Sequence, residues 1–388
     1  MKKIQNYLCQ PKVILVVYLV VSLIIAIQHY LGGAVKYNNF IIFRQSFFHL
    51  LDHKNLHLEY PLEYYDIFLY HPSFSILFAP LSLIPLPISL ALWLMACSVI
   101  LFFAIKSLPI PKNGKTFIWW FVLVELVTSL HNQQTNPIIA AFGLFTFIFM
   151  EKNNPRMASI FPILAFCIKG YGLIFAALFL FYPRKREFIL YSVVWLLLLT
   201  LLPLPFVGID YFQQIYQDWS NCLIGDHKVN FGLSIMGLLK VWWPAMEIKD
   251  ATLIQLAGVA LFAVTWSINL FKGTYKSLNT RLLLLAYSCL WVILFNHASE
   301  SPTYIIAITG VSIFYIVNRQ NHWATSLIVI VYLFSILIPT DIYPSLWKKA
   351  FFYPYLIKAI PCLLVWIVLQ LQLLFSPIPH FNVIKGAN

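Results

Sequence analysis

Acidic residues are few in this chain, with only 14 Asp and Glu among 388 residues, and charged side chains of either sign make up 10% of it. A soluble domain needs a polar surface, so a sequence that is 61% hydrophobic with a mean hydropathy of +0.80 is excluded from that class. The six cysteines show no CxxC spacing, so the sequence predicts neither a metal site nor a disulfide framework. Without a GxGxxG, Walker or HExxH motif, a nucleotide donor or a zinc mechanism has no support.

Long apolar runs rich in Leu, Ile and Phe are what the sequence does contain. They predict an all-α polytopic membrane protein with about twelve transmembrane helices, because a bilayer requires about 20 apolar residues per crossing. We expect one integral-membrane domain over residues 1–388. The predicted helices lie near residues 13–32, 88–106, 117–131, 136–150, 157–169, 171–183, 188–207, 251–271, 282–297, 302–318, 323–338 and 355–375.

The distribution of charge predicts the orientation. The net charge of +12 would suggest nucleic acid if the basic residues clustered on one soluble face, but they fall in short loops, so no nucleic-acid partner is expected. One alternating set of these loops, with both chain ends, carries 16 Lys and Arg but only the acids Glu151 and Glu187. The positive-inside rule then places both termini in the cytoplasm, with the protein in the cytoplasmic membrane. Residues 33–87 and 208–250 become large extracytoplasmic loops, the first carrying interfacial helices.

The first of these loops gathers most of the groups that could do chemistry. Its acids are Asp52, Glu59, Glu63 and Asp66, interleaved with tyrosines and histidines. A concentration of acids beside a membrane span favours chemistry on a polar substrate. The alternative is a solvated loop whose tyrosines lie at the lipid headgroups.

Further polar clusters fall at outward helix ends. Residues 131–136 join two spans with six consecutive hydrogen-bonding residues, which suits either a binding site or a turn. Lys169 lies between two short apolar helices beside glycines, so its ammonium either approaches a phosphate or snorkels to the surface. His297 and Glu300, three residues apart, either cooperate on one helical face or form a polar cap.

Five segments, in order, make the chain resemble glycosyltransferase family 87. They are Lys36-Tyr37-Asn38-Asn39-Phe40, Tyr70-His71-Pro72, Leu92-Trp93, Asn132-Gln133-Gln134-Thr135-Asn136 and Ile168-Lys169-Gly170-Tyr171, and the resemblance covers most of residues 13–310. It implies a GT-C fold and a hexosyltransferase that takes a sugar, typically mannose, from a polyprenyl phosphate with inversion. It implies no cofactor and no bound metal.

The resemblance also assigns site residues. The family's donor-side lysine corresponds to Lys169 and its outer histidine to His297. Its amide turn corresponds to Gln133, Gln134 and Asn136, and Asn39 and His71 are expected to complete the donor site. The family's acid after the first helix falls on Asn38 or Asn39, and an amide cannot act as a general base. We therefore expect a neighbouring acid to do so, with Asp66 ahead of Glu63 and Glu59.

The function predicted from these residues is a membrane glycosyltransferase. Its partners would be a polyprenyl-phosphate sugar donor, a glycan or glycolipid acceptor and membrane lipids. A transporter or flippase for a lipid-linked saccharide is one alternative, although the polar clusters lie on one side rather than near the bilayer middle. A non-catalytic protein that binds such a lipid is the other.

Overall fold

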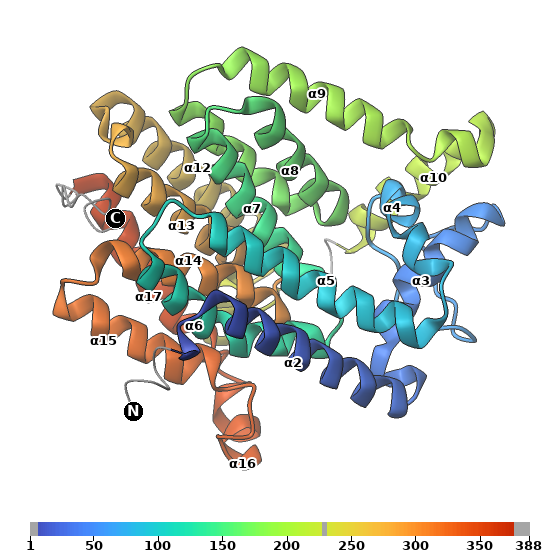
Figure 1. The fold of residues 1–388 in the computed structure, drawn as a ribbon, viewed down its shortest axis with the longest axis horizontal. Helices are drawn as coiled ribbons and strands as arrows, with labels where there is room; N and C mark the ends of the chain where they lie inside the picture. Colours follow the sequence, from blue (N-terminus) through green and yellow to red (C-terminus); the bar gives the residue numbers. More distant parts are fainter. Residues whose placement is uncertain (1–6, 227–230, 376–388) are drawn as a thin grey trace. The chain divides into compact units, whose positions relative to one another are not determined.

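A computed structural model describes residues 7–226 and 231–375, and over these ranges the chain is helical with no strand (Figure 1). The predicted all-α fold is thus confirmed. Three segments lie outside the described residues. They are residues 1–6 and 376–388, at the predicted cytoplasmic ends, and residues 227–230, in the predicted second outer loop.

The chain divides into two compact units. Unit 1 comprises Met1–Ala104, Ser129–Ala176 and Arg184–Val229, and unit 2 comprises Ile105–Thr128, Ala177–Pro183 and Asn230–Asn388.

Unit 1 is built from helices whose starts the sequence marks clearly. Pro72 and Pro155 each occupy a first helical turn, where proline's missing N–H costs nothing, and the preceding His71 and Asn154 side chains accept hydrogen bonds from the new helix. α8 packs against both α7 and α9, and α3 packs against α4. The elements are α2 (Pro11–Leu31), η1 (Ala34–Tyr37), α3 (Asn38–Leu51), α4 (Pro72–Ser82), most of α5 (Leu86–Ser107), α7 (Asn136–Glu151), α8 (Pro155–Ile168), part of η2 (Gly170–Phe181), α9 (Lys185–Leu201) and α10 (Leu204–Asp226).

Unit 2 has its core where α13 and α14 pack against each other and against α17. Nearly every residue of α13 and α14 is buried, which explains why both are apolar all round rather than amphipathic. The elements are most of α6 (Lys112–His131), α11 (Ile235–Trp242), α12 (Ile248–Lys272), η3 (Thr274–Lys276), α13 (Leu278–Leu294), η4 (Ser301–Thr303), α14 (Tyr304–Asn318), α15 (His322–Val331), η5 (Tyr332–Ile336), α16 (Ser345–Trp347), η6 (Lys348–Phe352) and α17 (Ala359–Phe375).

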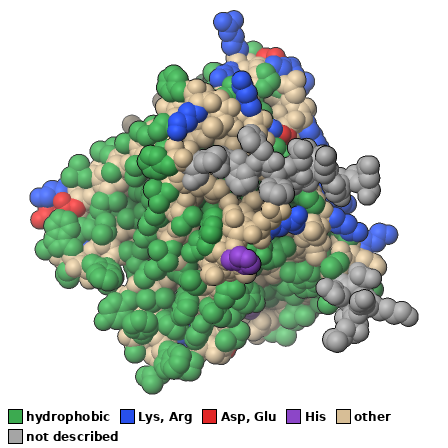
Figure 2. All heavy atoms as spheres, turned by 90° about the vertical axis from the view of Figure 1, so that its left-hand side faces the viewer, with side chains coloured by type: hydrophobic (Ala, Val, Ile, Leu, Met, Phe, Trp, Pro, Cys, Tyr) green, Lys and Arg blue, Asp and Glu red, His purple; other side chains and the backbone are tan. Residues whose placement is uncertain are grey.

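Among the described residues, four helices are long and apolar enough to cross a membrane: Pro11–Leu31, Leu86–Ser107, Ile248–Phe271 and Ser301–Asn318. A bent pair, Lys185–Leu201 with Leu204–Gly225, makes a fifth candidate if it counts as one span. Figure 2 shows hydrophobic side chains over a broad area of the face it presents. Such an exposed apolar surface indicates a membrane protein.

The predicted helix over residues 188–207 is broken. The two halves of the bent pair meet at 88°, and Gly208 has a positive φ of 72°. Pro203 lies at the break, where its missing N–H group cannot continue the helical hydrogen bonds of α9, and Pro205 lies in the first turn of α10. α10 then continues into residues 208–226, which the sequence analysis places in the second outer loop.

An ion pair is enclosed within unit 2. Lys358 Nζ lies 2.8 and 3.1 Å from the two carboxylate oxygens of Glu125, and both side chains are almost fully buried. The same ammonium donates to the hydroxyl of Ser301 at 2.9 Å and to its carbonyl at 3.2 Å. The pair therefore joins α6 and the residue before α17 to the start of η4.

We predict that Lys358→Met leaves Glu125 as a buried carboxylate without its cation and lowers the free energy of unfolding by about 3–5 kcal/mol. The double variant Lys358→Met with Glu125→Gln should be less costly, because no charge remains buried. Thermal unfolding in detergent micelles measures both. Exposed Lys349→Met is the control, and a Lys358→Met protein as stable as this control would contradict the prediction.

Candidate functional site

A lysine and two amide side chains meet in unit 1. Lys169, half-buried and extended, follows the last residue of α8. Its Nζ donates to Gln134 Oε1 at 3.0 Å and to Asn136 Oδ1 at 3.3 Å, and the Tyr171 hydroxyl donates to the same Asn136 oxygen at 3.2 Å. Three of the predicted donor-site residues are thus brought together. The amide oxygens orient the ammonium, and a lysine ammonium is a group that binds anions such as phosphate.

A close approach of backbone to helix keeps Lys169 in place. A Cβ on Gly172 would lie 2.5 Å from the Cβ of Ala165, so this position of η2 packs against α8 only because the residue is glycine. The Gly172 N–H also donates to the Lys169 carbonyl at 2.8 Å.

Gln133 organises the turn that carries the two amides. Its backbone has a positive φ of 47°, and its side chain is buried. Its Nε2 donates to the carbonyls of His131 at 2.7 Å and Lys36 at 3.2 Å, while its own carbonyl accepts from the Trp93 indole at 2.9 Å. These bonds fasten the turn to the segment after α2 and to α5, which is a positioning role.

Asn38 and Asn39, at the start of α3, also hold neighbouring backbone in place. Asn39 Nδ2 donates to the Asn132 carbonyl at 2.9 Å, which links α3 to the same turn. Asn38 pairs with the backbone of Tyr65, donating to its carbonyl at 2.7 Å and accepting from its N–H at 2.8 Å. The residue held in this way directly precedes Asp66.

The three candidate acids have different surroundings. Asp66 is exposed, has a φ of 79°, and accepts a hydrogen bond from Ile67 N–H at 2.8 Å. Glu59 is also exposed. Glu63 lies 3.0 Å from Nε2 of buried His49, whose other ring nitrogen lies 3.5 Å from the Tyr64 hydroxyl. The loop is therefore more than a solvated connection.

Sequence reasoning missed His49, because only the folded loop brings α3 and residue 63 together. Burial lowers the pKa of His49, and the Glu63 carboxylate opposes that shift. The imidazole is therefore neutral near pH 7, with a carboxylate on one side and a phenol on the other.

His71 lies close to Lys169 through the backbone. Its N–H donates to the Cys167 carbonyl at 3.2 Å, and its Nδ1 accepts from Ser73 N–H at 3.2 Å as the cap of α4. Burial, with a smaller contribution from nearby His57, lowers the pKa of His71 to about 4. His71 is thus a neutral group at neutral pH.

His297, the remaining candidate, belongs to unit 2, whereas the others belong to unit 1. Its Nδ1 lies 3.3 Å from Gln255 Nε2. Of the two alternatives for His297 and Glu300, a shared helical face is excluded, because α13 ends at Leu294 and residues 296–300 are not helical. Glu300 instead caps η4 through reciprocal hydrogen bonds with Thr303.

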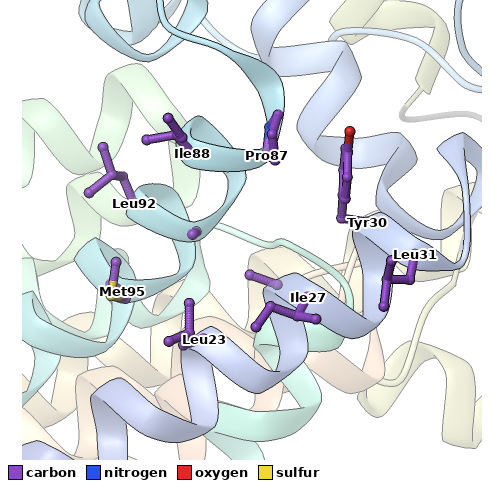
Figure 3. Close-up of a pocket in the computed structure, with 10 residues that line it drawn as sticks. Leu23, Ile27, Tyr30, Leu31, Pro87, Ile88, Leu92 and Met95 are labelled. Atoms are coloured by element: carbon purple, nitrogen blue, oxygen red, sulfur yellow. The ribbon is translucent and has the colours of Figure 1, made fainter.

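An apolar groove of about 340 Å³ lies between α2 and α5 in unit 1 (Figure 3). Leu23, Ile27 and Tyr30 line it from α2, facing Ile88 and Leu92 of α5. None of the predicted site residues lines this groove. Among the described residues, no three His, Cys, Asp or Glu side chains are grouped to hold a metal ion.

The helical membrane architecture and the lysine–amide cluster define an integral-membrane protein with a candidate site for an anionic group. The profile of glycosyltransferase family 87 matches residues 68–339, well over half of the chain. The chain belongs to this family, as the sequence resemblance predicted, and is a membrane glycosyltransferase. No curated protein matches it. The matched segment contains Lys169, the amide turn, His71 and His297 but begins after Asp66.

We predict that stability falls as the pH drops from 6.5 towards 4. Burial lowers the pKa of His57, like that of His71, from 6.5 to about 4. Below pH 6.5 the unfolded chain takes up protons that the folded chain does not, so acid favours unfolding. His57→Gln should lose less thermal stability than the wild type between pH 7 and 4.5. Exposed His322→Gln is the control, and identical pH profiles for wild type and His57→Gln would refute the prediction.

Proposed function

We propose that this protein transfers a sugar, mannose-like by family analogy, from a polyprenyl phosphate to a glycan or glycolipid at the outer face of the bacterial cytoplasmic membrane. The observation that carries the proposal is the Lys169 ammonium oriented by Gln134 and Asn136, in a chain of glycosyltransferase family 87. The reaction requires no cofactor, because the phosphate of the donor is itself the leaving group.

In the proposed reaction the acceptor hydroxyl attacks the anomeric carbon from the face opposite the phosphate. The new carbon–oxygen bond forms as the bond to the phosphate oxygen breaks, which inverts the configuration. Lys169 stabilises the negative charge on the departing polyprenyl phosphate, and a carboxylate takes the acceptor proton. Gln133 and Asn39 hold the turn at residues 131–136 in place. His71 binds the backbone of Cys167, two residues before Lys169.

Asp66 is the proposed general base, followed by Glu63 and Glu59. The Asn38 amide supports this choice, because it fixes the backbone of Tyr65 and therefore the position from which the Asp66 side chain projects. Glu63 is held by His49. It would be the base if the Asp66 carboxylate only stabilises its own turn through the hydrogen bond from Ile67 N–H.

The proposed fold is of the GT-C type, with about twelve membrane helices in a single membrane domain. The shorter apolar helices would supply the crossings beyond the long spans. Both termini would be cytoplasmic, with residues 33–87 and 208–250 outside. His297, three residues after the end of α13, would also be extracytoplasmic.

Two observations favour other functions. The enclosed Glu125–Lys358 pair is a feature expected of transporters for lipid-linked saccharides. The amides Asn38 and Asn39, at the position of the family acid, would suit a non-catalytic binder of the same lipid. A sugar-transfer assay of the purified protein with a panel of radiolabelled polyprenyl-phosphate sugars separates both from an enzyme.

We predict that Lys169→Met weakens binding of a radiolabelled polyprenyl-phosphate mannose by about tenfold or more, because a hydrogen bond to a charged group is lost. Lys169→Arg should retain part of the affinity, since it keeps the charge. Exposed Lys152→Met in the same unit is the matched control. Wild-type affinity in Lys169→Met would remove the phosphate-binding role.

For the base, Asp66→Asn should reduce sugar transfer by about 10²–10⁴-fold while donor binding persists. Exposed Asp52→Asn, in the same loop, is the control and should remain active. If Asp66→Asn is active and Glu63→Gln or Glu59→Gln is not, only the order of the candidates changes. Normal transfer by all three variants would show that the loop does not supply the base.

The topology predicts that a cysteine at Leu62, which is fully exposed in the first loop, reacts with a membrane-impermeant thiol reagent in intact cells. A cysteine at Lys152 should react only after permeabilisation. Cys9 and Cys222 are replaced by serine to remove background labelling. The reverse pattern would place the candidate site on the cytoplasmic side.

A further inference from the structure

One face of α10 is turned towards the first loop of unit 1. Tyr211, Ile215 and Asp218 follow one another at helical spacing and so share a face. Ile215 is fully buried, and the Tyr211 hydroxyl donates to the Lys54 carbonyl. The Tyr211 ring also stacks on His53, with centroids 4.7 Å apart. Asp218 therefore points to the loop side of the helix.

Three polar atoms of this region are buried without a hydrogen-bond partner in the part of the chain that the structure describes. They are Oδ2 of Asp218, Nε1 of Trp219 and Nε2 of His57. His57 is 6% exposed, and its other ring nitrogen binds the Phe68 carbonyl at 2.6 Å. Leaving a buried polar group unpaired is unfavourable, because the group loses its hydrogen bonds to water without replacing them, so three such atoms indicate groups that are reserved for a ligand.

Aromatic rings surround the same place. The Trp219 ring packs edge-on against His71 at 4.7 Å, and the Tyr216 ring does so at 5.2 Å. The ring centroid of Phe166, three residues before Lys169, lies 6.1 Å from that of His71. His57 is near enough to His71 for a charge on one ring to disfavour charge on the other. His71 thus lies beside Trp219 and near His57, and Asp218 directly precedes Trp219 on α10.

A carboxylate acceptor, an indole donor and an imidazole nitrogen among aromatic rings match the hydroxyl groups and apolar faces of a sugar. A phosphate fits less well, because the Asp218 carboxylate would repel it. We propose that Asp218, Trp219 and His57 form a binding subsite for a hexose ring. This assignment rests on the proposed function, which it deepens by naming where the sugar is held.

In this subsite Asp218 accepts a hydrogen bond from a sugar hydroxyl and Trp219 donates one. The role is binding, so loss of these groups should raise KM more than it lowers kcat. Asp218 should also cost nothing in stability when replaced, because its buried oxygen has no partner in the described structure. If Asp218 had a purely structural role, its replacement would instead lower the stability of the protein.

The experiment is saturation-transfer NMR on the full-length protein in detergent micelles. The probes are methyl α-mannopyranoside, methyl α-glucopyranoside and methyl α-galactopyranoside, with no lipid donor present. At least one probe should bind the wild type, and Asp218→Ala and Trp219→Phe should each weaken that binding by about fivefold or more. Asp210→Asn, an exposed acid on the same helix, and Trp323→Phe, an exposed indole in unit 2, are the controls.

Failure to bind any of the three hexosides, or equal binding by all variants, would overturn the subsite. A lower unfolding temperature for Asp218→Ala than for Asp210→Asn would also count against it, since it would show a structural role. Because the assay contains no polyprenyl phosphate, it is independent of sugar transfer. Hexoside binding without transfer would sink the proposed enzyme and leave the subsite standing.

Discussion

A polar group enclosed by apolar helices must find its partner within the protein, and the geometry of both units follows from this constraint. Glu125 is tolerated inside unit 2 because Lys358 pairs with it, and Ser301 accepts two further hydrogen bonds from the same ammonium. In unit 1 the same requirement draws Gln133 onto the backbone of two neighbouring segments. These hydrogen bonds of Gln133 hold in place the turn that carries Gln134 and Asn136.

Unit 1 separates positioning from chemistry in a consistent way. Amides that bind backbone groups, such as Asn38 and Asn39, join the first loop to the turn. The side chains of Gln134 and Asn136, by contrast, bind the Lys169 ammonium and fix its position. Asn38 and Asn39 therefore have a structural role, because they fix the loop that carries the candidate acids.

Much of the fold could be predicted from the sequence, because long apolar runs leave few alternatives to membrane helices. The cluster of Lys169 with Gln134 and Asn136 was also foreseeable, since short motifs carried it. The pairing of His49 with Glu63 was not, because it depends on how the loop folds back onto α3. Lys358 escaped notice within an apolar run, far along the chain from Glu125.

The errors have local causes. Three-residue spacing suggested that His297 and Glu300 share a helical face, but the helix stops before both. The bend after α9 depends on prolines and Gly208 that leave an apolar run looking continuous. Asp218 was passed over because its sequence neighbourhood resembles any outer loop, and only the packing of α10 distinguishes it from Asp210.

Lys358 lies beyond the segment, residues 68–339, that defines the family in this chain. A protein shortened to that segment would keep Glu125 and Ser301 but lose the cation that holds them together. Lys358 and the following helix, α17, which packs against α13, are thus integral to unit 2. Any attempt to trim this chain, or to graft its matched region onto another membrane scaffold, must carry a basic residue to the same depth.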